Sequence, residues 1–139
     1  MRRFLFLLAL APFVLAVVAR ADTRLVPGER MDQIVEVRDV RMAADGTVTG
    51  VVANRSDHAL RDLRLRVDYE FLWDKERSPG AVSPGRIETA DVPGPIRPGG
   101  TAEFTHAPSE PLPARNDGRF QPHVDVSDAT MLEEAPALR

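Results

Sequence analysis

The feature that most constrains the fold of this chain is the unbroken alternation of apolar and charged residues over positions 63–71. The apolar positions are Leu63, Leu65, Val67, Tyr69 and Phe71, and the charged positions between them are Arg64, Arg66, Asp68 and Glu70. In a helix this order would place charges on every face, whereas in a β-strand it sends the apolar side chains to one side and the charges to the other. The pattern predicts a β-strand with one face on a core and one in water.

Further strand-like segments surround this one and are separated by turn residues. They span residues 34–42, 48–53, 86–92, 101–106 and 120–126, and only residues 128–135 tolerate a helix. In the first segment the apolar phase changes sides near Arg38 and Asp39, which predicts a β-bulge. Residues 74–100 contain four Pro-Gly turns. Short strands with frequent turns favour an all-β fold, and we expect an antiparallel immunoglobulin-like β-sandwich.

The N-terminal residues have the three-part pattern of a secretory signal peptide. Arg2 and Arg3 precede an uncharged apolar run over residues 4–18, and the small residues Ala19 and Ala21 then frame a cleavage site. The run is shorter than the roughly 20 apolar residues that a membrane-spanning helix needs. We therefore expect a cleaved signal peptide and an exported protein, periplasmic or extracellular, with a retained N-terminal anchor as the alternative.

This expectation divides the chain into four parts. They are the signal peptide at 1–21, an N-terminal extension at 22–33, the β-sandwich domain at 34–128 and a C-terminal tail at 129–139. Removal of the signal peptide leaves 15 basic and 21 acidic residues, a net charge of −6. Such a domain, without a basic cluster, is not expected to bind nucleic acid or an anionic membrane surface, nor to insert into the membrane after cleavage. The chain has no cysteine, which excludes disulfides and thiol chemistry.

Three stretches of the sequence resemble the FxLYD-type extracellular domains. They are residues 48–56 (VTGVVANRS), 69–74 (YEFLWD) and 96–104 (IRPGGTAEF). These stretches are similar to that family's glycine-valine-asparagine strand and turn, its aromatic-to-aspartate strand end and its Pro-Gly turn. The sequence departs from the family pattern at Trp73 and in the long segment after it. The resemblance implies an immunoglobulin-like sandwich in a secreted or envelope protein, and it implies no active site to transfer to this chain.

Few residues are arranged for catalysis or metal binding. No histidine lies two or four positions from another, and no serine lies in a Gly-x-Ser-x-Gly motif. The acidic clusters near the C-terminus have nothing predicted to bury them. His106 and His123 would approach each other if the two C-terminal strands pair, which makes them weak candidates for a metal site, although solvated histidines are the simpler interpretation. We expect no enzymatic activity and no cofactor.

The best candidates for a contact surface are Trp73, Arg64 and Arg66. Tryptophan and arginine are enriched at interaction hot spots, although a mixed-charge stripe usually only solvates a sheet, and Trp73 is equally suited to cap the core. The motif at 54–56 fits a glycosylation site, but its place between two strands favours a turn. We predict an exported, non-enzymatic module that binds another envelope or secreted protein. The alternative is a periplasmic metal or small-ligand carrier that uses the histidines; the oligomeric state stays open.

Overall fold

The computed structural model describes residues 22–75 and 82–133. These residues form mostly β-strands, and the helical structure among them is too short to cross a membrane. In chain order the elements are β1 (Asp22–Leu25), α1 (Gly28–Ile34), β2 (Val35–Met42), β3 (Val48–Asn54), β4 (Ala59–Trp73), β5 (Arg86–Asp91), β6 (Thr101–His106) and β7 (Gly118–Glu133). The predicted signal peptide at 1–21 lies outside the described residues, as does the end of the predicted tail.

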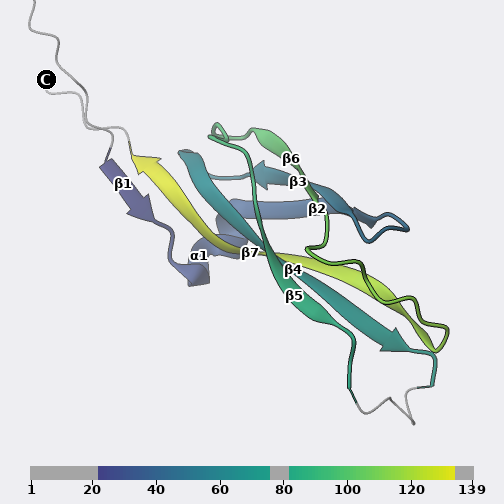
Figure 1. The fold of residues 1–139 in the computed structure, drawn as a ribbon. Coiled ribbons are helices and arrows are strands. Elements are labelled where there is room, and N and C mark those ends of the chain that lie inside the picture. Colours follow the sequence, from purple (N-terminus) through teal and green to yellow (C-terminus); the bar gives the residue numbers. More distant parts are fainter. Residues whose placement is uncertain (1–21, 76–81, 134–139) are drawn as a thin grey trace, which may run out of the picture.

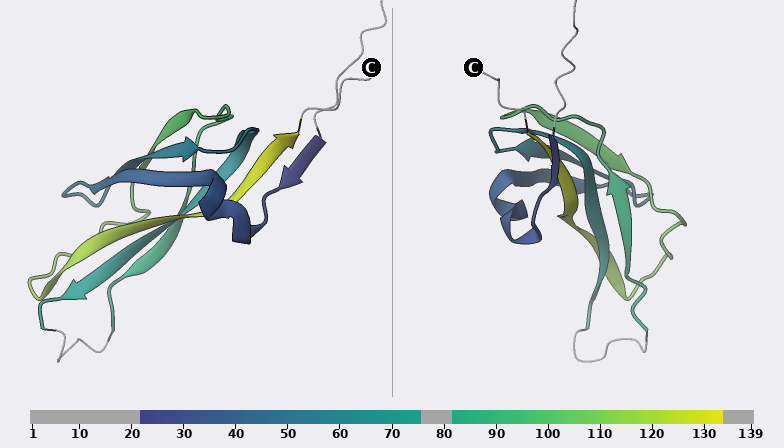
Figure 2. Two further views of the ribbon diagram at one scale, coloured as in Figure 1. Left: turned by 180° about the vertical axis from the view of Figure 1, so that it is seen from behind. Right: turned by 90° about the vertical axis from the view of Figure 1, so that its left-hand side faces the viewer.

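The strands of the described residues form two sheets. One has the order β1-β7-β4-β5 and the other the order β2-β3-β6, and all pairings are antiparallel. Figure 1 shows the long strands β4 and β7 beside β5, with β2, β3 and β6 in a second layer, and Figure 2 shows the same layers from behind and from the side. One apolar cluster takes side chains from both sheets, such as Val52 of β3 and Val67 of β4. The predicted all-β, antiparallel class is confirmed.

Strand β4 follows the predicted alternation. Leu65, Val67 and Tyr69 are fully buried, whereas Arg64 and Arg66 are exposed. This strand is central to its sheet, because it pairs with β7 along one edge and with β5 along the other. Burial of a leucine or valine side chain contributes about 1.5–3 kcal/mol, so the inner row of β4 is a main source of the stability of the fold.

The predicted bulge in β2 is confirmed. The pairing of β2 with β3 shifts register between Arg38 and Arg41, and Asp39 has a positive φ of 55°. Aspartate adopts this left-handed conformation more readily than most residues, because its short polar side chain can hydrogen-bond locally. The extra residue reverses the phase of the strand, so that Val37 before the bulge and Val40 after it both pack against the core.

The sheet extends beyond both ends of the predicted domain at 34–128. Strand β1 pairs with the last four residues of β7, and Met31 of α1 is buried in the core. The predicted N-terminal extension and the start of the predicted tail are therefore part of the fold. The helix tolerance expected at 128–135 is not realised over residues 128–133, because β1 and β4 both offer backbone partners there and this pairing outweighs a weak local preference.

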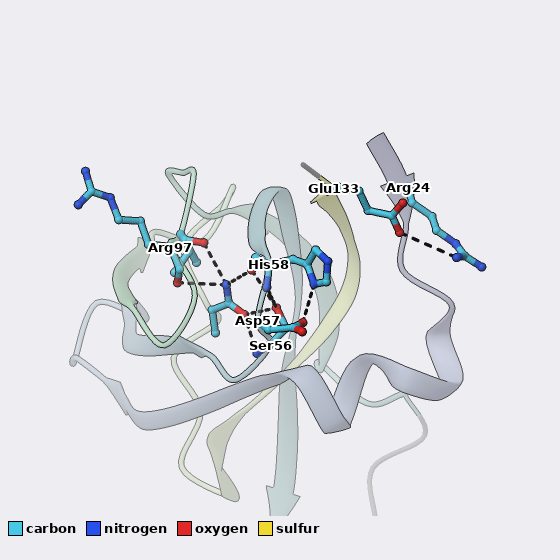
Figure 3. Close-up of polar contacts among 8 residues, drawn as sticks. Arg24, Ser56, Asp57, His58, Arg97 and Glu133 are labelled. Carbon is cyan, nitrogen blue, oxygen red and sulfur yellow. Dashed lines mark hydrogen bonds and ion pairs between the residues drawn. The ribbon is translucent and has the colours of Figure 1, made fainter. Parts of the chain in front are cut away.

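Asn54, at the end of β3, is the buried polar residue of the described chain. Its side-chain amide donates to the carbonyl oxygens of His58, Ile96 and Arg97 at 2.8, 3.0 and 3.1 Å. Its side-chain oxygen accepts from the backbone N–H of Ser56 at 2.9 Å and from its hydroxyl at 2.7 Å. Figure 3 shows this network, which ties the β3–β4 turn to the segment after β5. The amide is fully used inside the fold, which accounts for asparagine at this turn.

The two longest strands extend past the smaller sheet. Strands β4 and β7 have 15 and 16 residues against 7 in β3, which at about 3.3 Å per residue corresponds to about 50 Å against about 23 Å. Trp73 at the end of β4 pairs with Gly118 at the start of β7. The irregular segment 107–117 runs from β6 along this end of the sheet to the start of β7 (Figure 1). Over the projecting end of β4 and β7, where the smaller sheet has no strand, this irregular segment lies against the larger sheet.

Candidate functional site

Three aromatic rings gather at the projecting end of β4 and β7. Phe71 packs edge-on against Trp73, with ring centroids 4.9 Å apart, and against Phe120 at 5.0 Å. Phe71 is buried, and the other two rings are half-buried. Gly118 permits this packing, because a Cβ there would lie 2.6 Å from the Phe71 ring and still closer to the carbonyl oxygen of Leu72. Trp73 therefore continues the inner row of β4 while part of its ring stays accessible.

Arg115, from the segment between β6 and β7, lies over these rings. Its Cζ atom is 5.2 Å from the centroid of Trp73 and 5.5 Å from that of Phe71, which is within the range of cation–π attraction. Its Nε and Nη2 also donate to the two carboxylate oxygens of Asp117. These hydrogen bonds raise the pKa of Arg115 and lower the pKa of Asp117. The guanidinium is fixed in position, and its Nη1 is not used by Asp117.

A groove of about 440 Å³ lies beside this cluster. Most of its lining residues are apolar in type, and they are Met42, Ala43, Ala44, Gly46, Phe71, Leu112, Pro113, Ala114, Gly118 and Phe120, together with Arg115 and Arg119. The lining thus comes from the β2–β3 turn, from the segment between β6 and β7, and from the paired ends of β4 and β7. Both charged residues of the lining are arginines, although the chain as a whole has a net charge of −3. A hollow of this size and lining is of the kind that takes side chains or small ligands.

The segment between β6 and β7 is held against β5 by charged residues. Glu88 accepts hydrogen bonds from the backbone N–H of Ser109 at 3.0 Å and from its hydroxyl at 2.8 Å, and Arg86 donates to the carbonyl oxygen of Glu110. His106 Nε2 lies 2.8 Å from the Glu88 carboxylate. Arg86 Nε is 2.9 Å from it, in an ion pair whose angle is poor for a hydrogen bond. Glu88 thereby connects the edge strands of the two sheets and positions one wall of the groove.

The Glu88 carboxylate is held in its charged form. Burial alone would raise its pKa, but the hydrogen bonds from Ser109 and His106 and the charge of Arg86 outweigh burial, and the net pKa lies below its ordinary value. The pKa of Tyr69, whose ring centroid is 6.4 Å from that of His106, is raised by burial and then by the charge of Glu88. Ser109, His106 and Arg86 occupy the carboxylate oxygens, so Glu88 acts as a structural tie.

The sequence analysis missed the inward charges of β5, although a signal for them exists. Ala90 and Val92 are buried and set the inward phase of this strand. Arg86 and Glu88 have the same phase, because side chains of a strand alternate with a period of two, whereas Ile87 is 54% exposed. An inward charge predicts a buried partner, but the strand that supplies this partner depends on the arrangement of the two sheets.

Of the predicted contact residues, Trp73 lies at the aromatic cluster, whereas Arg64 and Arg66 do not. Both arginines are on the outer face of β4, while Trp73 continues its inner row, and Arg66 is about 23 Å from Trp73 along the strand. Arg64 pairs with Asp91 at 3.2 Å, and Arg66 with Asp68 at 3.6 Å. The structure therefore does not bring Trp73 together with the two arginines, because the alternation of the strand places them on opposite faces.

A second hollow, of about 520 Å³, lies at the other end of β4. Its charged lining residues pair with one another, Arg61 with Asp62 at 3.1 Å and Arg64 with Asp91. Exposed pairs of this kind contribute little to stability. The charges of the lining cancel, so this hollow favours neither an anionic nor a cationic ligand.

The structure does not bring the two candidate histidines together. His106 is on β6, which pairs with β3, and it faces Glu88. His123 is on β7, which pairs with β4, and it lies 3.1 Å from Asp125. The two strands belong to different sheets, so they do not pair as a shared site would require. Over residues 22–75 and 82–133, no group of three or more His, Asp or Glu side chains is placed to hold a metal ion.

Comparisons with known proteins identify no relative. No family model matches the chain, and searches of curated proteins and of solved structures give no match. Any function assigned to the chain therefore rests on its own residues and geometry.

Proposed function

We propose that this chain is an exported, non-enzymatic module that binds another envelope or secreted protein. Its binding surface is the aromatic end, which we define as Phe71, Trp73, Arg115 and Phe120. The observation that carries the proposal is the half-buried Trp73, packed on Phe71 and covered by the Arg115 guanidinium beside an open groove. Tryptophan and arginine are enriched at interaction hot spots. Their positions here are fixed before binding, which lowers the entropy cost of association.

The proposal includes an immunoglobulin-like β-sandwich of the FxLYD type. It is supported by two antiparallel sheets that share one apolar cluster, as the sheets of a sandwich do. The stretches that resemble FxLYD-type domains, 48–56, 69–74 and 96–104, fall on β3, on the end of β4 and on the turn into β6. Export is supported by the signal-like pattern of residues 1–21.

A binding role is also favoured by the state of Glu88. This inward-facing carboxylate accepts its hydrogen bonds from Ser109 and His106 and is kept ionised by them. It stabilises a wall of the groove, and a carboxylate with a lowered pKa is a poor proton donor. The groove therefore offers shape, aromatic surface and positive charge, which are means of recognition.

The test is a cross-linking pull-down with the chain from Asp22 to Arg139, which contains every element of the described fold. We expect one saturable protein partner from the envelope fraction of the source organism. The Trp73→Ala and Arg115→Gln variants should lose this partner, because each removes one half of the stack between ring and guanidinium. Arg66→Ala, on the outer face of β4, is the matched control and should keep it.

Each variant is first checked for a cooperative urea transition, so that loss of the partner is not loss of the fold. Capture of the same partner by both aromatic-end variants would show that the binding surface lies elsewhere. Retention of the chain only on polysaccharide or metal resin, with no protein captured, would overturn the protein-binding function itself.

A further inference from the structure

We infer that the groove beside the aromatic end binds an extended, apolar segment of the partner protein that carries a carboxylate side chain. The inference rests on the proposed function and specifies the chemistry of the partner. Three features of the groove carry it: the sign of its charges, its position along a strand edge and the composition of its walls.

The charges of the groove favour an anionic group. Its only charged lining residues in the described chain are Arg115 and Arg119. Arg115 is held by the Trp73 ring and by Asp117, which occupies Nε and Nη2 and leaves Nη1 for another acceptor. Arg119 is exposed and forms no ion pair with the residues that the structure describes. Guanidinium groups that are fixed in place recognise carboxylates with good geometry.

The groove lies along the edge of β7. Three consecutive residues, Gly118, Arg119 and Phe120, all line it, although neighbouring residues of a strand point to opposite faces. Contact with all three indicates that the hollow reaches the backbone of β7 at this end and runs beside the strand. At this position β7 pairs with β4 on one side, while β1 pairs only with its far end. The other edge has backbone groups that an extended peptide can pair with, as in β-strand addition.

The walls suit alternate side chains of such a peptide. Met42 and Leu112 line the groove from two different segments, and Phe120 lines it from β7. An extended segment presents every second side chain to one face, so apolar residues on either side of one carboxylate would meet apolar walls and an arginine. A peptide fits this open strand edge better than an acyl chain, which gains most from complete enclosure.

The experiment uses Trp73 as a local probe, because it is the only tryptophan of the chain. The chain from Asp22 to Arg139 is titrated with three sets of short synthetic peptides. The sets share the same alternating apolar positions and differ in one central residue, which is glutamate, glutamine or lysine. We expect Trp73 fluorescence to change with the glutamate set at an affinity about tenfold above that of the lysine set, and this preference should weaken with added salt.

Charge reversal supplies the matched variants. Arg119→Glu should reverse the preference from the glutamate set to the lysine set, because like charges then oppose the carboxylate. Arg66→Glu makes the same change on the outer face of β4 and should leave the preference unchanged. Both variants should retain the wild-type circular dichroism spectrum and urea midpoint, which separates recognition from folding.

The outcomes distinguish this inference from the proposed function. Equal binding of the three sets, or an unchanged order in Arg119→Glu, would overturn the carboxylate inference and leave binding at the aromatic end intact. If Trp73 fluorescence changed with the fatty acid dodecanoate but with none of the peptide sets, the peptide inference would be overturned and the ligand would be an acyl chain. If Trp73 fluorescence changed with none of these probes, the inference would also be overturned. A pull-down partner that depends on Trp73 would then still support the proposed function. If no such partner were captured either, the inference and the proposed function would both be overturned.

Discussion

Replacement of Asn54 by aspartate should destabilise the fold more than replacement by alanine, although aspartate has nearly the shape of asparagine. The Asn54 amide donates to the carbonyl groups of His58, Ile96 and Arg97, and the residue is 1% exposed. Each carbonyl also accepts a second hydrogen bond, in turn from Ser56 Oγ, Leu60 N–H and Gly100 N–H. Alanine therefore leaves no carbonyl without a partner. It removes the three hydrogen bonds that the amide donates and the one that its oxygen accepts from the Ser56 N–H, while the Ser56 hydroxyl can still donate to His58. At about 1 kcal/mol for each hydrogen bond, the expected loss is about 4 kcal/mol.

Aspartate keeps the oxygen that Ser56 uses but directs a second oxygen at the three carbonyl groups. The three hydrogen bonds that the amide donates are lost, and a buried carboxylate that faces three carbonyl oxygens adds about 4 kcal/mol. We therefore expect a total loss of about 7 kcal/mol at pH 7. Burial raises the pKa of the introduced carboxyl above its unfolded value of about 3.9. Its penalty is therefore absent below the unfolded pKa and grows as pH rises toward the folded pKa. The difference in unfolding free energy between Asn54→Asp and Asn54→Ala should therefore shrink on acidification from pH 7 toward about pH 4.

The assay is urea unfolding of the wild type and both variants, followed by Trp73 fluorescence and by circular dichroism at neutral and acidic pH. Asn116→Asp makes the same chemical change at an exposed position and should change the free energy of unfolding by less than about 0.5 kcal/mol. If Asn54→Asp were as stable as the wild type at pH 7, or more stable than Asn54→Ala, the hydrogen-bond roles assigned to this side chain would be refuted. Asn54 would then act only as a turn former.

Four other predictions test the packing and the Glu88 tie. Val67→Asp should abolish the cooperative urea transition, because Val67 is fully buried in β4 and a carboxylate there has no partner; a wild-type melt would contradict the strand register. Arg66→Ala, on the exposed face, should change the unfolding free energy by less than about 0.5 kcal/mol, and a large loss would mean that this face is covered. Glu88→Gln should flatten the acid side of the stability profile, measured by urea titration from about pH 6 to pH 3. The folded pKa of Glu88 is depressed, so its contribution is present above its unfolded pKa of about 4.3 and is lost as pH falls through the folded value; identical wild-type and variant slopes would contradict the tie. Gly118→Ala should lose about 2 kcal/mol or more, because its Cβ would collide with the β4 backbone. Gly28→Ala in α1 has open space and should gain up to about 1 kcal/mol, so equal stabilities of these two variants would argue against the packing at the strand ends.

Local pattern was sufficient to predict most strands of this protein. The alternation over 63–71 specifies a strand because only a period of two separates its charges from its apolar residues. The change of phase near Asp39 marks a bulge for the same reason. The strand predicted at 101–106 from its flanking turn residues has the same bounds as β6 (Thr101–His106). The expectation of a helix at 128–135 failed over residues 128–133, because that segment has no local pattern and its conformation comes from pairing with β1 and β4.

The candidate site depends instead on contacts between distant parts of the chain. Trp73 meets Arg115, and Glu88 meets Ser109, across connections that no local window contains. Which strands become neighbours depends on how all the apolar rows are buried together, and this is a property of the whole chain. The sequence by itself determined that β4 has an inner apolar row and an outer charged row. Only the tertiary structure, through the excess length of β4 and β7 over the smaller sheet, decided that Trp73 lies beside a groove and under the Arg115 guanidinium.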